Sequence, residues 1–203
     1  FDWRTVTRSY GLRTVELLEQ FIEESFKDLP KGLKTHISTV VEIARELAET
    51  HSADASEVYL ASKGHDICRL TPPEVLLELA TGFSIPISDV DREIPMLLHG
   101  PVGANILAQH MDSFNHSIYD AVYWHTTGNY DLDDVGKIVF LADKLDPVKK
   151  TRYPYQRLLR DLAFKNLNNA MKEFLDREII SLVNQGNLVH PQMLVARNKF
   201  NGK

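Results

Sequence analysis

The chain has 203 residues, of which 43% are hydrophobic and 25% are charged, and its formal net charge at pH 7 is −5. This length suits one well-buried domain, alone or with an appendage, and the composition is typical of globular proteins. The negative charge argues against a protein that coats nucleic acid, because phosphate binding needs clustered Lys and Arg side chains. An anionic substrate is still compatible with this charge if a metal ion supplies local positive charge.

Cysteine content and hydropathy indicate the compartment. Cys68 is the only cysteine, which excludes an internal disulfide and fits a reducing cytoplasm. No apolar run approaches about eighteen residues and no signal peptide is recognisable, so we expect a cytoplasmic protein that does not enter a membrane. Because the sequence begins with Phe1, we expect either a trimmed chain or a piece of a longer polypeptide.

Near the start of the chain, hydrophobic residues recur every three or four positions, which predicts amphipathic helices. The first of these covers residues 12–26 and is expected to end at Pro30 and Gly32. The second covers residues 36–51 and has His36 in its first turn. This second helix has the clearest period in the sequence.

Two helix-start signals follow. Asp54 is expected to cap a third helix, with Glu57 closing a capping box, and this helix runs into residues 65–66. Residues 71–74 combine a capping threonine, a proline at the first helical position and a glutamate, which predicts a helix that ends at Gly82.

The middle of the chain is less regular. Residues 83–93 contain prolines and acids without a clear period, and we predict a connection there. After a short apolar turn at Pro95, a helix is expected to reach Met111. Its small residues Gly100 and Gly103 would let another backbone approach closely.

The rest of the chain also has a helical period. Residues 112–115 supply turn and cap residues for the next helix. The predicted helices cover residues 118–125, 135–145, 158–164 and 167–183. Their stop signals are Gly128, Pro147 and Gly186. No stretch alternates at period two for long enough to predict a strand, so the sequence predicts an all-α fold.

The candidate functional residues are centred on the adjacent pair His65 and Asp66. Adjacent residues of a helix point about 100° apart, so both side chains reach one point only if it lies close to the backbone, as a metal ion can. Imidazole and carboxylate donors suit iron, manganese or zinc. The pair by itself is also compatible with a capped helix end that carries a hydrogen-bonded histidine.

Further histidines and an aspartate stand at or near other predicted helix boundaries. They are His36, His99, His125 and Asp143. The order is a lone His, then His-Asp, then two separated His, then a late Asp, and it arises by chance far less often than any single piece. This pattern predicts two to four ligands for one metal, with further groups for a second metal or for substrate.

In this order of residues the chain resembles the HD-domain phosphohydrolases, an all-helical superfamily, and within it the YqeK family of symmetrical bis(nucleosyl)-tetraphosphatases. The resemblance covers residues 33–198 and rests on the segments at 36–40, 64–67, 97–104, 125–128 and 137–144. It implies an HD-domain helical bundle with an additional N-terminal helix. The implied parts are an extension or linker at 1–32, the HD domain at 33–198 and a tail at 199–203.

The resemblance also implies a role for each residue of the pattern. The implied metal ligands are His36, His65, Asp66 and Asp143. The implied substrate-binding residues are His99, His125, Thr126, Arg69 and Lys149. The implied catalytic residues are Asp66, His99, His125 and Arg69. The cofactor would be iron, with manganese or zinc as alternatives, as one or two ions, and His99 and His125 could hold the second.

The implied reaction is hydrolysis of diadenosine tetraphosphate to two ADP by a metal-activated water, in a family that prefers homodimers. A phosphoanhydride is kinetically stable because its charged oxygens repel nucleophiles, and a metal ion neutralises those oxygens and activates water. Two alternatives remain. One is an HD phosphohydrolase acting on a nucleotide monophosphate, triphosphate or cyclic dinucleotide, and the other is a non-catalytic helical module that senses nucleotides.

Some positions depart from the family pattern. Arg69 stands where the family usually has lysine, and Lys149 or Lys150 replaces an arginine that usually follows the late aspartate. Leu33 replaces another arginine before the first histidine. These changes bear on the identity of the substrate more than on hydrolysis itself.

The remaining histidines and the cysteine have ordinary structural interpretations. We expect no catalytic role for the surface or helix-end residues His51, His110, His116 and His190. Cys68 is expected to pack as a small hydrophobic side chain beside the metal.

Overall fold

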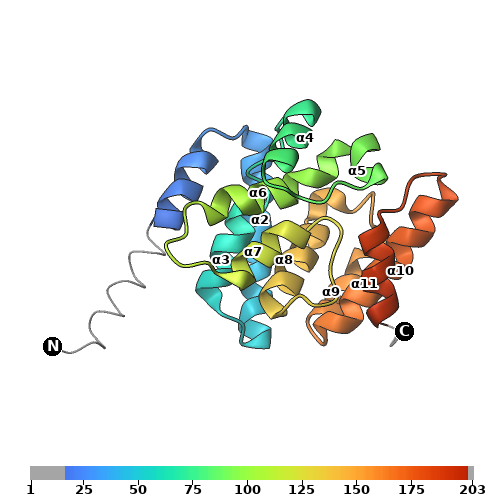
Figure 1. The fold of residues 1–203 in the computed structure, drawn as a ribbon. Helices are drawn as coiled ribbons and strands as arrows, with labels where there is room; N and C mark the ends of the chain where they lie inside the picture. The colour runs from blue at the N-terminus through green and yellow to red at the C-terminus, as the bar shows by residue number, and fades with distance from the viewer. Residues whose placement is uncertain (1–16, 201–203) are drawn as a thin grey trace.

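A computed structural model describes residues 17–200 of the chain, and every regular element in that range is a helix (Figure 1). Residues 17–27 are helical. The elements that follow are α2 (Lys31–His51), α3 (Ala55–Gly64), α4 (Pro73–Gly82), α5 (Asp89–Glu93), η1 (Pro95–Leu98), α6 (His99–Ala108), α7 (His116–Trp124), α8 (Asp134–Leu145), η2 (Pro147–Lys149), α9 (Gln156–Ala163), α10 (Leu167–Asn184) and α11 (Pro191–Phe200). The all-α prediction is therefore confirmed.

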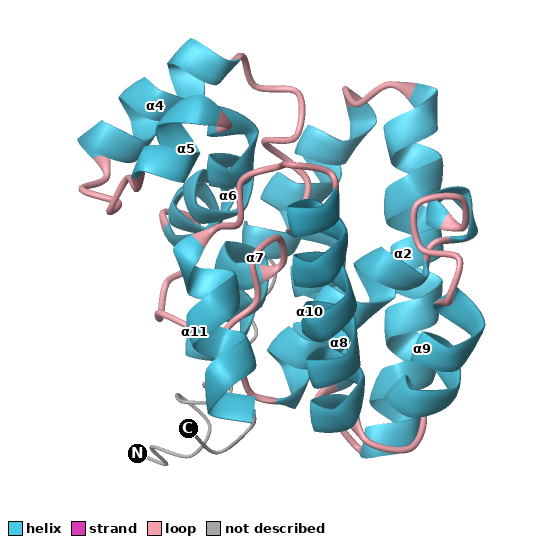
Figure 2. Ribbon diagram, turned by 90° about the vertical axis from the view of Figure 1, so that its right-hand side faces the viewer, coloured by secondary structure: helices cyan, strands magenta, loops and turns pink. Residues whose placement is uncertain are grey.

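Helix α8 is the centre of the fold, and α2, α3, α7, α9 and α10 all pack against it (Figure 2). Its residues are buried around the whole circumference, which is the property of a helix enclosed by others. Phe140 of α8 stacks edge-on against Phe174 of α10, with ring centroids 5.2 Å apart. This burial fixes the end of α8, which carries Asp143.

A second, smaller core lies at one end of the molecule, where α4, η1 and α6 pack together, with α5 against η1 (Figure 1). Cys68 is buried in this core, which agrees with our prediction that it packs as a small hydrophobic side chain. The two cores meet at Ile67 and Tyr123, which pack against both. The segment that follows α3 therefore lies between them.

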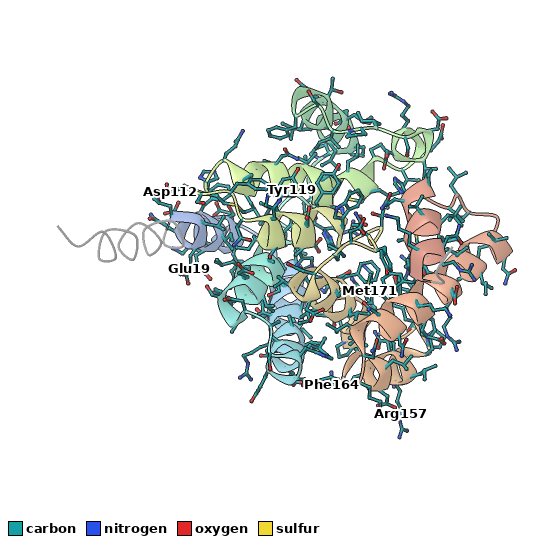
Figure 3. The ribbon with its side chains drawn as sticks, turned by 60° about the horizontal axis from the view of Figure 1, so that its bottom comes forward. Glu19, Asp112, Tyr119, Arg157, Phe164 and Met171 are labelled. Carbon is teal, nitrogen blue, oxygen red and sulfur yellow. The ribbon has the colours of Figure 1, made fainter. Side chains whose placement is uncertain are left out.

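Outer and inner side chains are separated clearly in Figure 3. Arg157 of α9 is exposed at the periphery, while Met171 of α10 is fully buried among the helices. The helix over residues 17–27 belongs to the same body, because Leu18 and Ile22 are buried in the main core. Residues 12–16, where we predicted the start of this helix, lie outside the described range.

The start of α2 differs from the prediction. The helix begins at Lys31, with Pro30 as its N-cap in extended conformation, and Gly32 lies inside it. A proline at the boundary begins this helix as well as ending the previous one, which the hydrophobic period did not reveal. His36 therefore sits in the second turn of α2, not in the first.

Capping residues were predicted with mixed success. Asp54 caps α3 by accepting from Ser56 and Glu57 backbone N–H groups, both at 2.9 Å. Glu57 does not close a capping box, because its carboxylate accepts from Asn115 Nδ2 at 2.7 Å. Thr71 does not cap α4 either, since Pro72 occupies the cap position.

Three other boundaries correct the sequence interpretation. The predicted connection 83–93 contains α5, which begins with a capping box between Ser88 and Asp91. The helix expected to reach Met111 ends at Ala108, and α11 was not predicted at all. Among residues 17–200, no helix is long and apolar enough to cross a membrane.

Candidate metal centre

The residues of the predicted pattern converge at one place, although they come from separate helices. His36 lies in α2, His65 and Asp66 follow α3, His99 begins α6, His125 follows α7 and Asp143 lies near the end of α8. All of these except His36 are buried, and the His36 side chain is only 12% exposed.

Three of the histidines are oriented by the same local device. His65, His99 and His125 occupy the C-cap positions of α3, η1 and α7. Each Nδ1–H donates to the carbonyl three residues earlier, at 2.7, 2.5 and 2.7 Å respectively. Helix ends have carbonyls without intrahelical partners, so a histidine there satisfies one of them and turns Nε2 away. All three Nε2 atoms consequently face the centre.

His36 is oriented by a carboxylate instead. Its Nδ1–H donates to Asp146 Oδ2, a residue that the sequence analysis did not select. Asp146 also accepts from the backbone N–H of Val148 at 3.0 Å, and Gln156 Nε2 donates to the Asp146 carbonyl at 2.8 Å. The only sequence signal for Asp146 was its place between the end of α8 and Pro147. A carboxylate that orients a histidine is a common partner of metal ligands.

The first group of donors contains His36, His65, Asp66 and Asp143. Nε2 of His36 lies 3.1 Å from Asp143 Oδ1 and 3.5 Å from Asp66 Oδ2. Nε2 of His65 lies 3.6 Å from Asp66 Oδ2 and 3.7 Å from Asp143 Oδ1. His65 Nε2 is buried and has no hydrogen-bond partner. Nitrogen and carboxylate donors gathered around an unpaired imidazole nitrogen fit a transition-metal ion.

The second group shares Asp66 with the first. Asp66 Oδ1 lies 2.9 Å from His99 Nε2 and 3.5 Å from His125 Nε2, while the two Nε2 atoms are 2.9 Å apart. These three residues also have the spacing of metal ligands. Asp66 therefore turns one oxygen to each group, as a residue bridging two ions would.

Charges in the centre suit cation binding. Burial by itself would raise the pKa of Asp66, but its interactions with His65, His125 and His99 hold this pKa well below its usual range. Burial lowers the pKa of His125 to about 3, more than the nearby Asp66 carboxylate raises it. Near neutral pH, Asp66 is therefore ionised and His125 neutral, which are the states in which both bind metals.

Two lysines adjoin Asp143. Lys144 Nζ donates to Asp143 Oδ2 at 2.7 Å and to the His125 carbonyl at 2.8 Å, and it lies 4.7 Å from the Phe140 ring centroid. Lys149 Nζ donates to Asp143 Oδ1. Burial would raise the pKa of Asp143, but the two ammonium groups hold it well below its usual range. Lys144 itself is buried, which depends on the packing of α8 against α10.

A pocket of about 440 Å³ opens beside the second group. Its lining includes Asp66, His99, His125 and Asp143, together with the predicted substrate-binding residues Arg69, Thr126 and Lys149. The hydroxyl of Thr126 is buried and without a hydrogen-bond partner. His36 and His65 are not part of this lining, so the first group meets the pocket only through its two carboxylates.

The histidines outside the pattern have structural partners. His51 Nε2–H donates to the Ala163 carbonyl at 2.7 Å, and His110 stacks on Phe21 at 3.6 Å between ring centroids. His116 is exposed and meets the Phe114 ring edge-on. His190 stands at a helix end, next to α11, and it also lines the pocket.

Comparison with known proteins places this arrangement in a family. The chain is 27% identical over 163 residues to a protein of Bacillus subtilis (strain 168) named "Bis(5'-nucleosyl)-tetraphosphatase, symmetrical", and the match covers 80% of this chain and 86% of that protein. A Staphylococcus aureus protein of the same name is 26% identical over 175 residues, covering 85% and 89% of the two chains.

A solved structure has the same fold. It is described as the crystal structure of a predicted HD superfamily hydrolase involved in NAD metabolism from Clostridium acetobutylicum, and it superimposes with a TM-score of 0.83 over 91% of this chain and 96% of that one, at 24% identity. The sequence model of the HD domain matches residues 33–148, which include every residue of both donor groups. This protein belongs to the HD domain family.

Proposed function

We propose that this protein is a metal-dependent hydrolase that cleaves diadenosine tetraphosphate symmetrically into two molecules of ADP. The bacterial relatives that carry the name of this activity, matched over 86% and 89% of their length, support the choice of substrate. The observation that carries the proposal is the unpaired, buried Nε2 of His65, which faces the carboxylates of Asp66 and Asp143. A cation is the group that pairs with this nitrogen and with the negative charge of both carboxylates.

In this proposal His36, His65, Asp66 and Asp143 hold one metal ion. Asp66, His99 and His125 hold a second ion where two are present. Iron is the metal we expect, with manganese and zinc as the alternatives that the same donors accept. When bound, the metal would neutralise substrate phosphate oxygens and lower the pKa of a water molecule towards neutrality.

Basic and polar side chains of the pocket would bind the phosphates. Arg69 is exposed at the pocket and offers a planar fork of donors, while Lys149 contributes a point charge beside Asp143. Thr126 offers a hydroxyl without another partner. This local positive charge offsets the net charge of −5, which would otherwise repel an anionic substrate.

Of the two pocket histidines, we assign the hydrogen bond to the leaving phosphate to His99. Burial lowers the pKa of His125 to about 3, and its remaining proton, on Nδ1, is donated to the Val122 carbonyl. Nε2 of His99 lies 2.9 Å from both Asp66 Oδ1 and His125 Nε2, so it is the nitrogen placed to donate where only the first metal ion is bound. A positioned proton donor contributes roughly 10²–10⁴-fold to such a reaction.

The test compares nucleotides and metals together. Metal content is measured on protein purified without chelators, and kcat/KM is then determined for diadenosine tetraphosphate, nucleoside mono- and triphosphates and a cyclic dinucleotide. We expect stoichiometric metal and a preference for diadenosine tetraphosphate. A preference for another nucleotide would replace the substrate, and metal-free protein whose activities are unchanged in His65→Ala would indicate a non-catalytic nucleotide-sensing module. We further propose a cytoplasmic homodimer, which sedimentation analysis tests.

A further inference from the structure

The pocket has an apolar part that the phosphate chemistry does not use. Leu182, Leu188 and Met193 line it from α10, α11 and the loop between them, and Ile94 and Leu97 line it from the segment around η1. Leu188 is 47% exposed and Ile94 is 38% exposed, so these side chains are available for contact. We call these five residues the apolar wall.

We infer that the apolar wall binds one nucleoside of the substrate, and that His190 is the positioning residue that holds the wall in place. The inference rests on the proposed function, since it assigns the part of that substrate which occupies this part of the site. Phosphate groups gain nothing from apolar contact, whereas a nucleobase has two faces that stack on apolar side chains irrespective of base identity.

The size of the pocket agrees with one half of the substrate. Its volume of about 440 Å³ falls in the range of roughly 300–1,000 Å³ that encloses a drug-sized ligand. One nucleoside diphosphate has this size, and diadenosine tetraphosphate is two of them joined end to end. With one nucleoside on the apolar wall and the phosphates at Asp66 and His99, the second nucleoside extends out of the pocket.

His190 joins the two segments that form the wall. Its Nε2–H points at Asp91 of α5, with both carboxylate oxygens at 3.3 Å. Its Nδ1 accepts from the backbone N–H of Gln192 at 3.1 Å, in the first turn of α11. Both ring nitrogens therefore have partners within the protein. For this reason His190 is suited to fixing the position of the apolar wall. It is not suited to hydrogen bonding with the nucleobase or to proton transfer.

Asp91 is itself held firmly. Its Oδ2 accepts from the backbone N–H of Ser88 at 2.9 Å and from the Ser88 hydroxyl at 2.7 Å, and its side chain is 6% exposed. Helix α5 packs on η1, where the Met96 carbonyl accepts from His99 Nδ1. The pair of His190 and Asp91 thus ties the C-terminal helices to the same segment that orients His99.

Three of the five wall residues lie outside the range that the HD domain model matches. That model ends at residue 148, and α10 and α11 come after it. The donor residues of the metal centre therefore lie within the matched range, while this side of the pocket is built by helices beyond it.

The test measures ADP binding by calorimetry and steady-state kinetics on metal-loaded protein. In His190→Ala we expect the Kd for ADP and the KM for diadenosine tetraphosphate to rise about tenfold, which corresponds to about 1.4 kcal/mol. We expect kcat within about twofold, unchanged metal content, and an unchanged Kd for pyrophosphate, because the wall does not contact phosphate. His190→Gln keeps a donor towards Asp91 and should recover most of the ADP affinity.

Two further variants separate the wall from general damage. Leu188→Ser alters only the exposed wall and should weaken ADP binding without affecting pyrophosphate binding. His116→Ala, an exposed histidine outside the pocket, is the matched control and should change nothing.

Each outcome bears on one proposal. An unchanged Kd for ADP in His190→Ala and Leu188→Ser overturns the inference, as does wild-type protein that binds pyrophosphate as tightly as ADP. Wild-type protein that binds ADP through the wall but does not cleave diadenosine tetraphosphate overturns the proposed function alone.

Discussion

Nε2 of His65 lies 3.7 Å from Oδ1 of Asp143, and the histidine nitrogen has no hydrogen-bond partner. Because Nδ1–H of His65 already donates to the Ser62 carbonyl, Nε2 presents a lone pair to a carboxylate oxygen. The unpaired His65 nitrogen is costly, since an unsatisfied buried polar atom costs about 1–3 kcal/mol. A cation bound between this nitrogen and the carboxylate removes the cost.

Metal binding should stabilise the protein. Because the donors converge only in the folded state, a metal at a thousand times its Kd adds about 4 kcal/mol to the free energy of unfolding. We expect the Tm in a thermal scan to rise on metal addition and to fall with a chelator. His65→Ala should abolish the rise, and an equal rise in that variant would show that the metal binds elsewhere.

Metal affinity should increase with pH in the neutral range. Burial would lower the pKa of His36, but hydrogen bonds with Asp143 and Asp146 prevail and raise it from 6.5. A metal must displace this proton, so affinity falls as the pH falls below the raised pKa. Calorimetry in buffers of different ionisation enthalpy measures the released proton.

The same shift affects the metal-free protein in the opposite direction. A raised folded-state pKa stabilises the fold fully below pH 6.5, and this contribution is lost as the pH rises through the raised value. The free energy of unfolding in urea, measured on metal-free protein, should therefore fall with rising pH over this window more steeply in wild type than in His36→Gln. Parallel pH profiles would contradict the assignment.

Arg69 should contribute to substrate binding more than to metal binding. We expect Arg69→Ala to lower kcat/KM by roughly 10–100-fold, because a hydrogen bond to a charged group is worth about 1.5–3 kcal/mol. Arg69→Lys keeps the charge and should recover part of the loss. Metal content measured on both variants should stay that of wild type, and loss of metal would instead place Arg69 in the metal centre.

Gly100 should be required for the position of His125. A Cβ at Gly100 would lie 2.9 Å from the Val122 carbonyl oxygen and 3.1 Å from His125 Cε1, so a backbone segment would have to move. We expect Gly100→Ala to cost about 1–3 kcal/mol in urea unfolding and to lower activity.

Gly103→Ala in the same helix is the matched control for Gly100→Ala. Its nearest contact would be an ordinary 3.6 Å to Ile67 Cγ1, so this variant should remain close to wild type. Equal stability of the two variants would disprove the role of close approach.

Local signals explain what could be predicted from the sequence. Asp54 was recognisable as a cap because a cap acts within three residues, and α8 because its hydrophobic pattern is continuous. The order of histidines and aspartates indicated residues that do converge, although the roles assigned to them remain predictions. The start of α2 was misplaced because Pro30 serves both as a stop and as a start.

The parts that were missed depend on contacts between distant segments. Asp146 gained its role only when α8 and α2 packed together and brought it to His36. His190 meets Asp91 across 99 positions of sequence, and neither residue has a neighbour that signals the other. Helix α5 is only five residues long, too short for a hydrophobic period to be visible. Such features follow from the tertiary structure and not from any local pattern.

The most direct test of the central claim is the identity of the products formed from diadenosine tetraphosphate. Chromatography of a reaction with metal-loaded protein should show ADP as the only nucleotide product. Chelator treatment should stop the reaction and added metal should restore it. Equal amounts of ATP and AMP, or turnover that chelation leaves unchanged, would contradict a symmetrical, metal-dependent hydrolase built on His65 and Asp66.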